Sequence, residues 1–275
     1  MKFGFVTCVR LGLDVMEEVY ELGGSLSLVI TLPDDRAQSK SGRVYLDDFC
    51  DRHGIALVKS PSVNDGRVAE AIREYEIDWL FIIGWSQIAQ PQLLATPRRG
   101  VIGMHPTLLP EGRGRASVPW AIIKDLPVTG VTMFVLNEGV DTGPILAQVT
   151  IPLTDQTTAT ELYESVVVAH RTLLRNTWTD LVTDQLQSIP QDPNDGSVWP
   201  GRTPDDGELL PSLTVAEALR LVRATAPPYP GAFWRTADAV IRVWVAVEGE
   251  VSDGPRFVCR DGVVTATVFD IEGSE

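Results

Sequence analysis

Short apolar runs alternate with amphipathic segments along the first two hundred residues. The apolar runs have the length and composition of buried strands, and they lie at residues 2–9, 25–31, 55–58, 79–83, 101–104 and 130–136. Helical periodicity is found between them, at residues 14–22, 44–53 and 65–75, and the first two of these segments end at glycine. Strands that alternate with helices of this length predict an α/β fold, in which a mainly parallel, Rossmann-like sheet has helices on both faces.

The pattern changes after residue 187, which divides the chain into three expected parts. Residues 156–186 have the periodicity of one long helix, whereas residues 188–206 are rich in proline, aspartate, asparagine and glycine. A short helix is predicted at 214–224, and strands are predicted at 239–247, 256–259 and 263–270. We therefore expect a main domain at 1–187, a linker strap at 188–210 and a small, mostly β domain at 211–275.

Composition narrows the kinds of partner. The 275 residues include 23 Lys and Arg against 37 Asp and Glu, a formal net charge of −14, and nucleic-acid backbones are bound by basic surfaces. No apolar stretch reaches the roughly 20 residues of a membrane-spanning helix, and the start of the chain does not resemble a signal peptide. Cys8, Cys50 and Cys259 are too widely spaced for a disulfide framework or a zinc site. We expect a cytoplasmic protein without metal, nucleic-acid or membrane partners.

Two polar positions beyond predicted strands are candidates for chemistry. In mainly parallel sheets, ligands bind outside the carboxyl ends of the strands, so residues 84–87 and His105 are expected to face that crevice. His105 is one of three histidines, and the imidazole is the side chain that titrates near neutral pH. Asp141 lies in a turn after the strand predicted at 130–136, and the two residues form a candidate acid–base pair. A G-x-G-x-x-G motif is absent after the first strand, which disfavours a dinucleotide site.

Three motifs carry a resemblance to a known family. Residues 103–110 read Gly-Met-His-Pro-Thr-Leu-Leu-Pro, Arg-Gly follows at 113–114, and Asp-Thr-Gly occupies 141–143. These motifs resemble the folate-dependent formyltransferases, whose pattern is Asn-x-His-Pro-Ser-Leu-Leu-Pro, Arg-Gly and Asp-x-Gly. Residues 200–207 and 228–233 resemble the C-terminal signatures of the family, so the resemblance covers nearly the whole chain and makes residues 1–187 the expected catalytic domain.

The resemblance implies transfer of a formyl group from N10-formyltetrahydrofolate, the expected co-substrate, to an amine. The amine attacks the formyl carbon to give a tetrahedral oxyanion, which His105 would stabilise or whose formation it would assist as a base. Asp141 would orient the imidazole and stabilise its positive charge. By the same resemblance, the folate would be held by Gly84, Trp85, Ser86, Gln87, Ile88, Leu109 and Asp141.

Gly103 is the main departure from the family pattern, because the family has asparagine two residues before the histidine. That asparagine donates to the oxyanion, and loss of one such donor typically lowers the rate by about 10²–10³. Three interpretations stay open. A backbone N–H, Ser86, Gln87 or an ordered water replaces the donor; the enzyme is simply slow; or the chain binds or hydrolyses the folate without transferring its formyl group.

The acceptor amine is predicted from charge and from the family signatures. Residues 201–275 contain seven Arg and no Lys against twelve Asp and Glu, a net of −5, which disfavours tRNA. We expect the primary amine of a nucleotide-linked amino sugar, with methionyl-tRNA as the alternative acceptor, and the β-rich tail could support a homodimer. Acceptor contacts are expected from Arg10, Arg43, Met104, Pro106, Thr107, Arg113, Arg115, Tyr229 and Phe233, although the last two could instead pack within the second domain.

Overall fold

The chain forms two compact units, each assembled from separate stretches of sequence. The computed structural model describes residues 1–36, 42–192, 194–251 and 253–273. The first unit comprises Met1–Arg113, Gly130–Thr150 and Val167–Ser197, and the second comprises Gly114–Thr129, Ile151–Val166 and Val198–Glu275. The predicted division at residues 187 and 210 stays a prediction.

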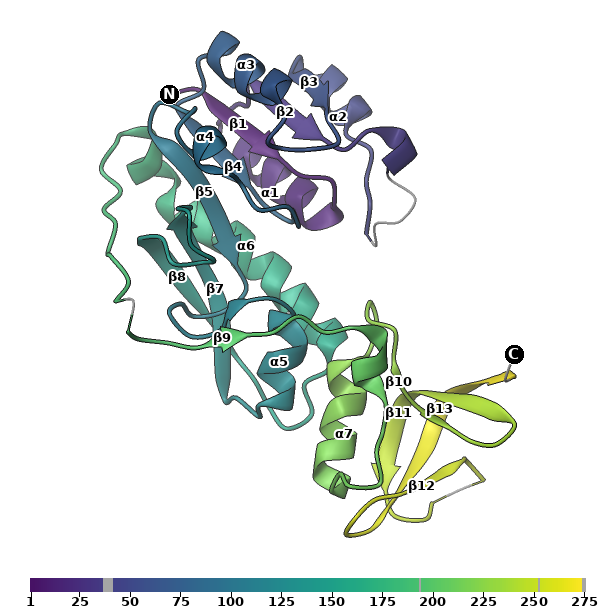
Figure 1. Ribbon diagram of the computed structural model, residues 1–275. Coiled ribbons are helices and arrows are strands. Elements are labelled where there is room, and N and C mark those ends of the chain that lie inside the picture. The colour runs from purple at the N-terminus through teal and green to yellow at the C-terminus, as the bar shows by residue number, and fades with distance from the viewer. Residues whose placement is uncertain (37–41, 193, 252, 274–275) are drawn as a thin grey trace. The chain divides into compact units, whose positions relative to one another are not determined.

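A seven-stranded sheet dominates the first unit, with the order β3-β2-β1-β4-β5-β7-β8 (Figure 1). Its strands are β1 (Phe3–Val6), β2 (Leu28–Thr31), β3 (Ala56–Lys59), β4 (Trp79–Ile82), β5 (Gly100–His105), β7 (Val128–Val135) and β8 (Ile145–Pro152). The pairs from β3 to β5 are parallel, and β5 pairs with β7 antiparallel. The predicted mainly parallel sheet is thus confirmed, whereas β8 was not predicted because its alternating residues are only partly buried.

Helices cover both faces of this sheet. They are α1 (Arg10–Glu21), α2 (Asp47–His53), α3 (Gly66–Glu74), α4 (Pro91–Leu94) and α6 (Ala159–Val182), with a 3-10 turn η1 at Asp34–Arg36. Strand residues such as Leu80 form one apolar cluster with Val68 and Ile72 of α3. On the other face, the ring of Phe3 lies 5.0 Å from that of Trp178 on α6.

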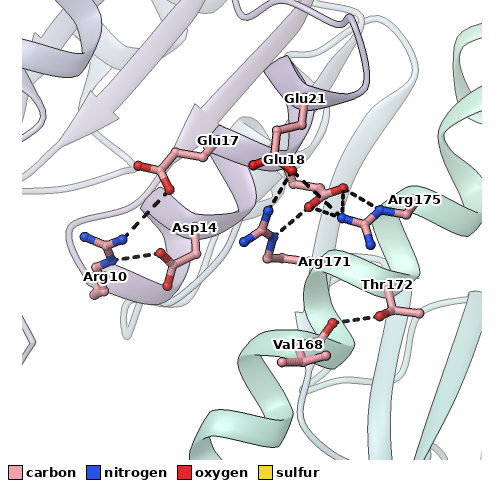
Figure 2. A network of polar contacts seen from close by, with 9 residues as sticks. All are labelled: Arg10, Asp14, Glu17, Glu18, Glu21, Val168, Arg171, Thr172 and Arg175. Atoms are coloured by element: carbon pink, nitrogen blue, oxygen red, sulfur yellow. Dashed lines mark hydrogen bonds and ion pairs between the residues drawn. The ribbon is translucent and has the colours of Figure 1, made fainter.

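A buried ion-pair network joins α1 to α6 (Figure 2). The carboxylate of Glu18 is fully buried, and it accepts from Nε of Arg171 at 2.6 Å and from Nε of Arg175 at 2.8 Å. Arg171 also reaches Glu21 at 2.8 Å. A buried carboxylate is tolerated only when it is paired and hydrogen-bonded, so these arginines fix the register of the two helices.

The second unit is built around a four-stranded antiparallel sheet of order β10-β11-β13-β12. Its strands are β10 (Ala232–Arg235), β11 (Ala239–Glu248), β12 (Arg256–Val258) and β13 (Val263–Gly273), and its helices are α5 (Ser117–Ile123) and α7 (Val215–Ala224). Residues of α7 and of this sheet share one apolar core. A small, mostly β C-terminal part is therefore confirmed, with β10 and α5 as additions to the predicted elements.

The predicted linker strap contains regular structure of its own. β9 (Val198–Trp199) pairs with β6 (Arg113–Gly114), and η2 is a 3-10 turn at Pro204–Gly207. Elsewhere the predicted helix at 44–53 begins only at Asp47, because the residues before it lie along the segment that follows β1. The N–H of Val44 donates to the carbonyl of Cys8, and Val9 is bridged to Arg43.

Candidate active site

His105 ends β5, and its side chain is almost completely buried. Nε2 lies 2.8 Å from the carbonyl oxygen of Gly112, and Nδ1 lies 3.6 Å from Oδ2 of Asp141. A carbonyl oxygen can only accept, so Nε2 carries a proton and Nδ1 is the nitrogen that faces the carboxylate. The structure therefore brings the predicted pair together, at a separation slightly longer than a hydrogen bond.

The loop that follows His105 is held by two side chains of neighbouring strands. The hydroxyl of Thr132 on β7 donates to the carbonyl of Thr107 at 2.7 Å and accepts from the N–H of Leu109 at 3.0 Å. Nε2 of Gln148 on β8 donates to that hydroxyl and to the carbonyl of Leu109, both at 2.8 Å. Each of these polar groups is satisfied inside the protein, which fixes the path of the chain on both sides of the imidazole.

Asp141 lies in a tight turn that only a few residues could form. Its φ of 54° is in the left-handed region, which non-glycine residues adopt at a cost of about 1 kcal/mol. A Cβ atom at Gly143 would lie 1.7 Å from the carbonyl oxygen of Val135, so glycine is required there. The hydroxyl of Thr142 donates to Oδ1 of Asn137 at 2.9 Å and closes the turn from the other side.

Gln191, which lies in the predicted strap, connects this turn to Arg113. Nε2 of Gln191 donates to the carbonyls of Asp141 at 2.9 Å and of Gly143 at 2.7 Å. Its Oε1 accepts from Nη2 of Arg113 at 2.8 Å and from Nε at 3.1 Å. Nη1 of Arg113 donates to the carbonyl of Asp195 at 3.0 Å. Arg113 is buried and its guanidinium links these segments, while its contact with the acceptor stays a prediction.

The segment after β4 lies at the same sheet edge as His105, because β4 and β5 are parallel neighbours. Gly84, Ser86 and Ile88 are exposed there, and Gly84 has a φ of 66°. Oε1 of Gln87 accepts from the N–H of Val63 at 2.9 Å, and its Nε2 donates to the carbonyl of Pro61 at 2.8 Å. Trp85 packs against the apolar cluster below the sheet edge. Gln87 and Trp85 thus support the segment, while its exposed positions are open to a ligand.

Gly103 lies in the middle of the sheet, and the space beside it is filled. A Cβ atom at this position would lie 2.6 Å from Cδ2 of Leu136 and 3.3 Å from Cε1 of Phe134. Any side chain at 103 would therefore compete with Leu136, which follows β7. Glycine in place of the family's asparagine is thus matched by the packing, because Leu136 occupies the volume into which a side chain at 103 would project.

The remaining residues predicted in the first unit have different surroundings. The guanidinium of Arg43 donates to Oγ1 of Thr31 at 2.9 Å and to the carbonyl of Leu32 at 2.7 Å, and Arg10 is exposed but paired with Asp14 at 2.7 Å (Figure 2). Pro106 is half-buried, and the side chains of Met104, Thr107 and Leu109 are buried. The burial of these side chains fits packing roles, and their contact with a ligand stays a prediction.

In the second unit, Arg115 is exposed and two predicted aromatic residues are packed. Burial raises the pKa of Tyr229 to about 12, so its hydroxyl is protonated at neutral pH. Phe233 is buried, with the guanidinium of Arg235 4.7 Å from its ring centroid. These surroundings favour the packing interpretation over stacking on a nucleotide base.

Sequence reasoning missed Thr132, Gln148 and Gln191, whose hydrogen bonds hold the segments around the pair. A lone threonine in a strand and glutamines in a strand or a proline-rich segment give no pattern that would single them out. Within the described residues, no group of three His, Cys, Asp or Glu side chains could hold a metal ion. In the same part of the chain, no helix has the length and hydrophobicity needed to cross a bilayer.

Comparison with known proteins places this chain in a family. The formyl transferase family model matches residues 24–177. A methionyl-tRNA formyltransferase from Ruminiclostridium cellulolyticum is 30% identical over 247 residues, which are 89% of this chain and 78% of that protein. Another, from Alkaliphilus oremlandii, is 26% identical over 275 residues, 97% of this chain and 88% of that protein.

Solved structures share the fold at low sequence identity. An N-formyltransferase from Helicobacter canadensis, in complex with folinic acid and dTDP-3-aminofucose, has a TM-score of 0.74 and 16% identity over all of both chains. HypX from Aquifex aeolicus, in complex with tetrahydrofolic acid, has a TM-score of 0.71 and 18% identity over 98% of this chain. This chain spans only 44% of HypX. Together with the family model and the relative at 30% identity, the fold leads to one conclusion: the chain belongs to the formyl transferase family.

Proposed function

We propose that this chain transfers a formyl group from N10-formyltetrahydrofolate to the primary amine of a nucleotide-linked amino sugar, with His105 and Asp141 as its catalytic residues. The observation that carries the proposal is the approach of these two side chains at the carboxyl end of β5, 3.6 Å apart. Family membership supplies the reaction class. The folate is supported by the folinic acid and tetrahydrofolic acid in the similar structures.

The chemistry needs a group that moves a proton and stabilises charge. A C–N bond forms between the acceptor amine and the formyl carbon, the bond from that carbon to N10 breaks, and the amine's proton ends on N10. Nε2–H of His105 is held by the Gly112 carbonyl, so Nδ1 is the atom that takes up and returns this proton. The Asp141 carboxylate then stabilises the imidazolium, and the imidazolium in turn stabilises the developing oxyanion.

The folate would be held at the exposed strand-end segment 84–88. Gly84 and the apolar side chain of Ile88 are both exposed there. Gln87 is committed to the backbone of residues 61–63, which favours a backbone N–H over Gln87 as the replacement donor. These features fit a flat ring bound by main-chain groups and an apolar wall.

The identity of the acceptor rests on separate observations. Support for an amino sugar comes from the dTDP-3-aminofucose complex of the similar Helicobacter canadensis enzyme and from the net charge of −14, which weakens attraction to a nucleic-acid backbone. Methionyl-tRNA is the second candidate, because the curated relative with 30% identity is a methionyl-tRNA formyltransferase. The third candidate function is a hydrolase or a binding protein, because Gly103 replaces the family's asparagine.

One assay separates these candidates. Tetrahydrofolate release from N10-formyltetrahydrofolate is measured without acceptor, with dTDP-3-aminofucose and other nucleotide-linked amino sugars, and with methionyl-tRNA. We expect release that depends on an amino-sugar nucleotide. Release with methionyl-tRNA but with no amino-sugar nucleotide would identify methionyl-tRNA as the acceptor. Release without any acceptor would indicate a hydrolase, and no release would indicate a protein that only binds its ligand. His105→Ala and Asp141→Asn should each lower kcat at least about 10²-fold with the fold intact, and turnover near that of the unchanged protein would exclude this pair.

A further inference from the structure

The side-chain amide of Gln191 uses its full hydrogen-bonding capacity at one junction. A glutamine amide has two N–H donors and an oxygen that accepts twice, and all four are engaged, with the carbonyls of Asp141 and Gly143 and with Nε and Nη2 of Arg113. The orientation of the amide is unique, because carbonyls only accept and a guanidinium only donates. Gln191 therefore links two parts of the site that are distant in sequence.

Each part controls one member of the catalytic pair. The Asp141–Gly143 turn carries the carboxylate, and its first residue is held at a φ of 54°. Arg113 follows Gly112, whose carbonyl binds Nε2 of His105, and the N–H of Arg113 donates to the carbonyl of Ser197 at 2.9 Å. The hydroxyl of Ser197 accepts from the N–H of Gly112 at 3.0 Å. Gln191 and Ser197 together thus contact both the imidazole side and the carboxylate side.

We propose that Gln191 is a positioning residue, which sets the Asp141 carboxylate against Nδ1 of His105 by tying the turn at 141–143 to Arg113. This inference rests on the proposed function of the pair. A strained backbone conformation persists only where its surroundings determine it, and the two bonds from Nε2 of Gln191 hold both ends of the Asp-Thr-Gly turn. Loss of these bonds would release Asp141 toward a relaxed backbone and away from the imidazole.

Gln191→Glu separates positioning from general anchoring. Glutamate has the same shape, and its carboxylate still accepts from the Arg113 guanidinium, so the anchor of the strap is retained or strengthened. The oxygen that replaces Nε2 would face the carbonyl oxygens of Asp141 and Gly143 and repel both. A matched control is Gln187→Glu, which adds the same charge to an exposed residue four positions earlier in the chain, whose amide donates to the carbonyl of Gln185.

The first measurement does not depend on activity. Amide hydrogen exchange of the whole protein is compared for the unchanged chain, Gln191→Glu and Gln187→Glu. We expect exchange at residues 138–144 to become at least about tenfold faster in Gln191→Glu alone, with exchange at residues 110–113 unchanged. Equal protection of the turn in both variants would overturn the inference, whatever the reaction of the protein proves to be.

The second measurement tests action through Asp141. With the acceptor that supports turnover, either dTDP-3-aminofucose or methionyl-tRNA, Gln191→Glu should lower kcat about 10- to 100-fold with little change in KM for the folate. In an Asp141→Asn background the same substitution should lower kcat no further, because the group that it positions is gone. A full additional loss there would overturn the inference, and so would unchanged kcat in Gln191→Glu. If Asp141→Asn itself retains kcat, the proposed function fails instead, and hydrogen exchange still decides the role of Gln191.

Discussion

A side chain introduced at Gly103 should be resisted by Leu136. The added Cβ would lie 2.6 Å from Cδ2 of Leu136, well inside van der Waals contact, and Phe134 on the other side is fully buried and paired with Gly103 across β5 and β7. Overpacking of this kind costs about 1–3 kcal/mol, of which alanine regains about 0.5–1 kcal/mol by restricting the unfolded chain. We expect Gly103→Ala to lower the free energy of unfolding by about 1–2 kcal/mol.

A double-mutant cycle assigns that loss to Leu136. Leu136→Ala alone should cost about 1–2 kcal/mol, less than a fully buried leucine, because the side chain is only partly buried. With the leucine removed, Gly103→Ala should cost nothing further, which gives a coupling energy of about 1–2 kcal/mol. Urea denaturation at constant m-value measures all three variants. If Gly103→Ala is as stable as the unchanged protein, or if the two losses add, the packing argument is wrong.

The same cycle shows whether the site lacks an oxyanion donor. Gly103→Asn should reduce turnover while Leu136 is present, since the asparagine has no space beside it. In the Leu136→Ala background, Gly103→Asn should raise kcat above that of Leu136→Ala alone, by up to about 10²-fold if a donor is missing. An unchanged kcat in that background would instead indicate that another group already supplies the donor.

Two further predictions concern the scaffold. Glu18→Gln leaves Arg171 and Arg175 without their buried carboxylate. Because both guanidiniums are partly exposed, we expect the free energy of unfolding, measured by urea denaturation, to fall by about 2–3 kcal/mol, which is below the range for fully buried pairs. Glu21→Gln, at an exposed partner, is the control, and an equal loss in both variants would contradict the argument. Burial raises the pKa of Cys50 to about 12, so its thiol should resist iodoacetamide at pH 8 in the folded protein and react in urea, and labelling at the rate of a free thiol would refute it. Because this pKa is raised on folding, the thiol's contribution to stability is complete below its unfolded pKa and is lost as the pH rises toward 12.

Much of the fold could be predicted because buried strands and helices show apolar runs or a periodic apolar pattern in the sequence. β1, β2 and β4 are continuous apolar runs in the centre of a parallel sheet, and their sequences show it. β8 lies at the edge with mostly exposed or half-buried residues, so its pattern was weak. The short helix α5 contains a proline and follows Ala116 in the left-handed conformation, features that local propensity does not associate with a helix.

The candidate pair could be predicted from the sequence, whereas the residues that position it could not. His105 and Asp141 follow predicted apolar strands, and the position of a residue just beyond a strand can be recognised from the sequence alone. Gln148 and Gln191 act through contacts with residues at least 16 positions away, and a single glutamine carries no periodicity. The sequence of the strap indicated only that it was irregular, although its hydrogen bonds decide the geometry of the site.

The arginines predicted to contact the acceptor also have partners within the protein. The guanidiniums of Arg113 and Arg43 donate to Gln191 and to the end of β2, and Arg10 is paired with Asp14; their contact with the acceptor stays a prediction. Within the described residues, these three arginines offer an approaching acceptor few uncommitted N–H donors. Polyanion binding depends on many such cations and weakens steeply with salt, whereas a nucleotide diphosphate can be held by one arginine and backbone N–H groups. The internal use of these arginines therefore favours a small acceptor, and it predicts a KM for the amino-sugar nucleotide that changes little between low and physiological salt.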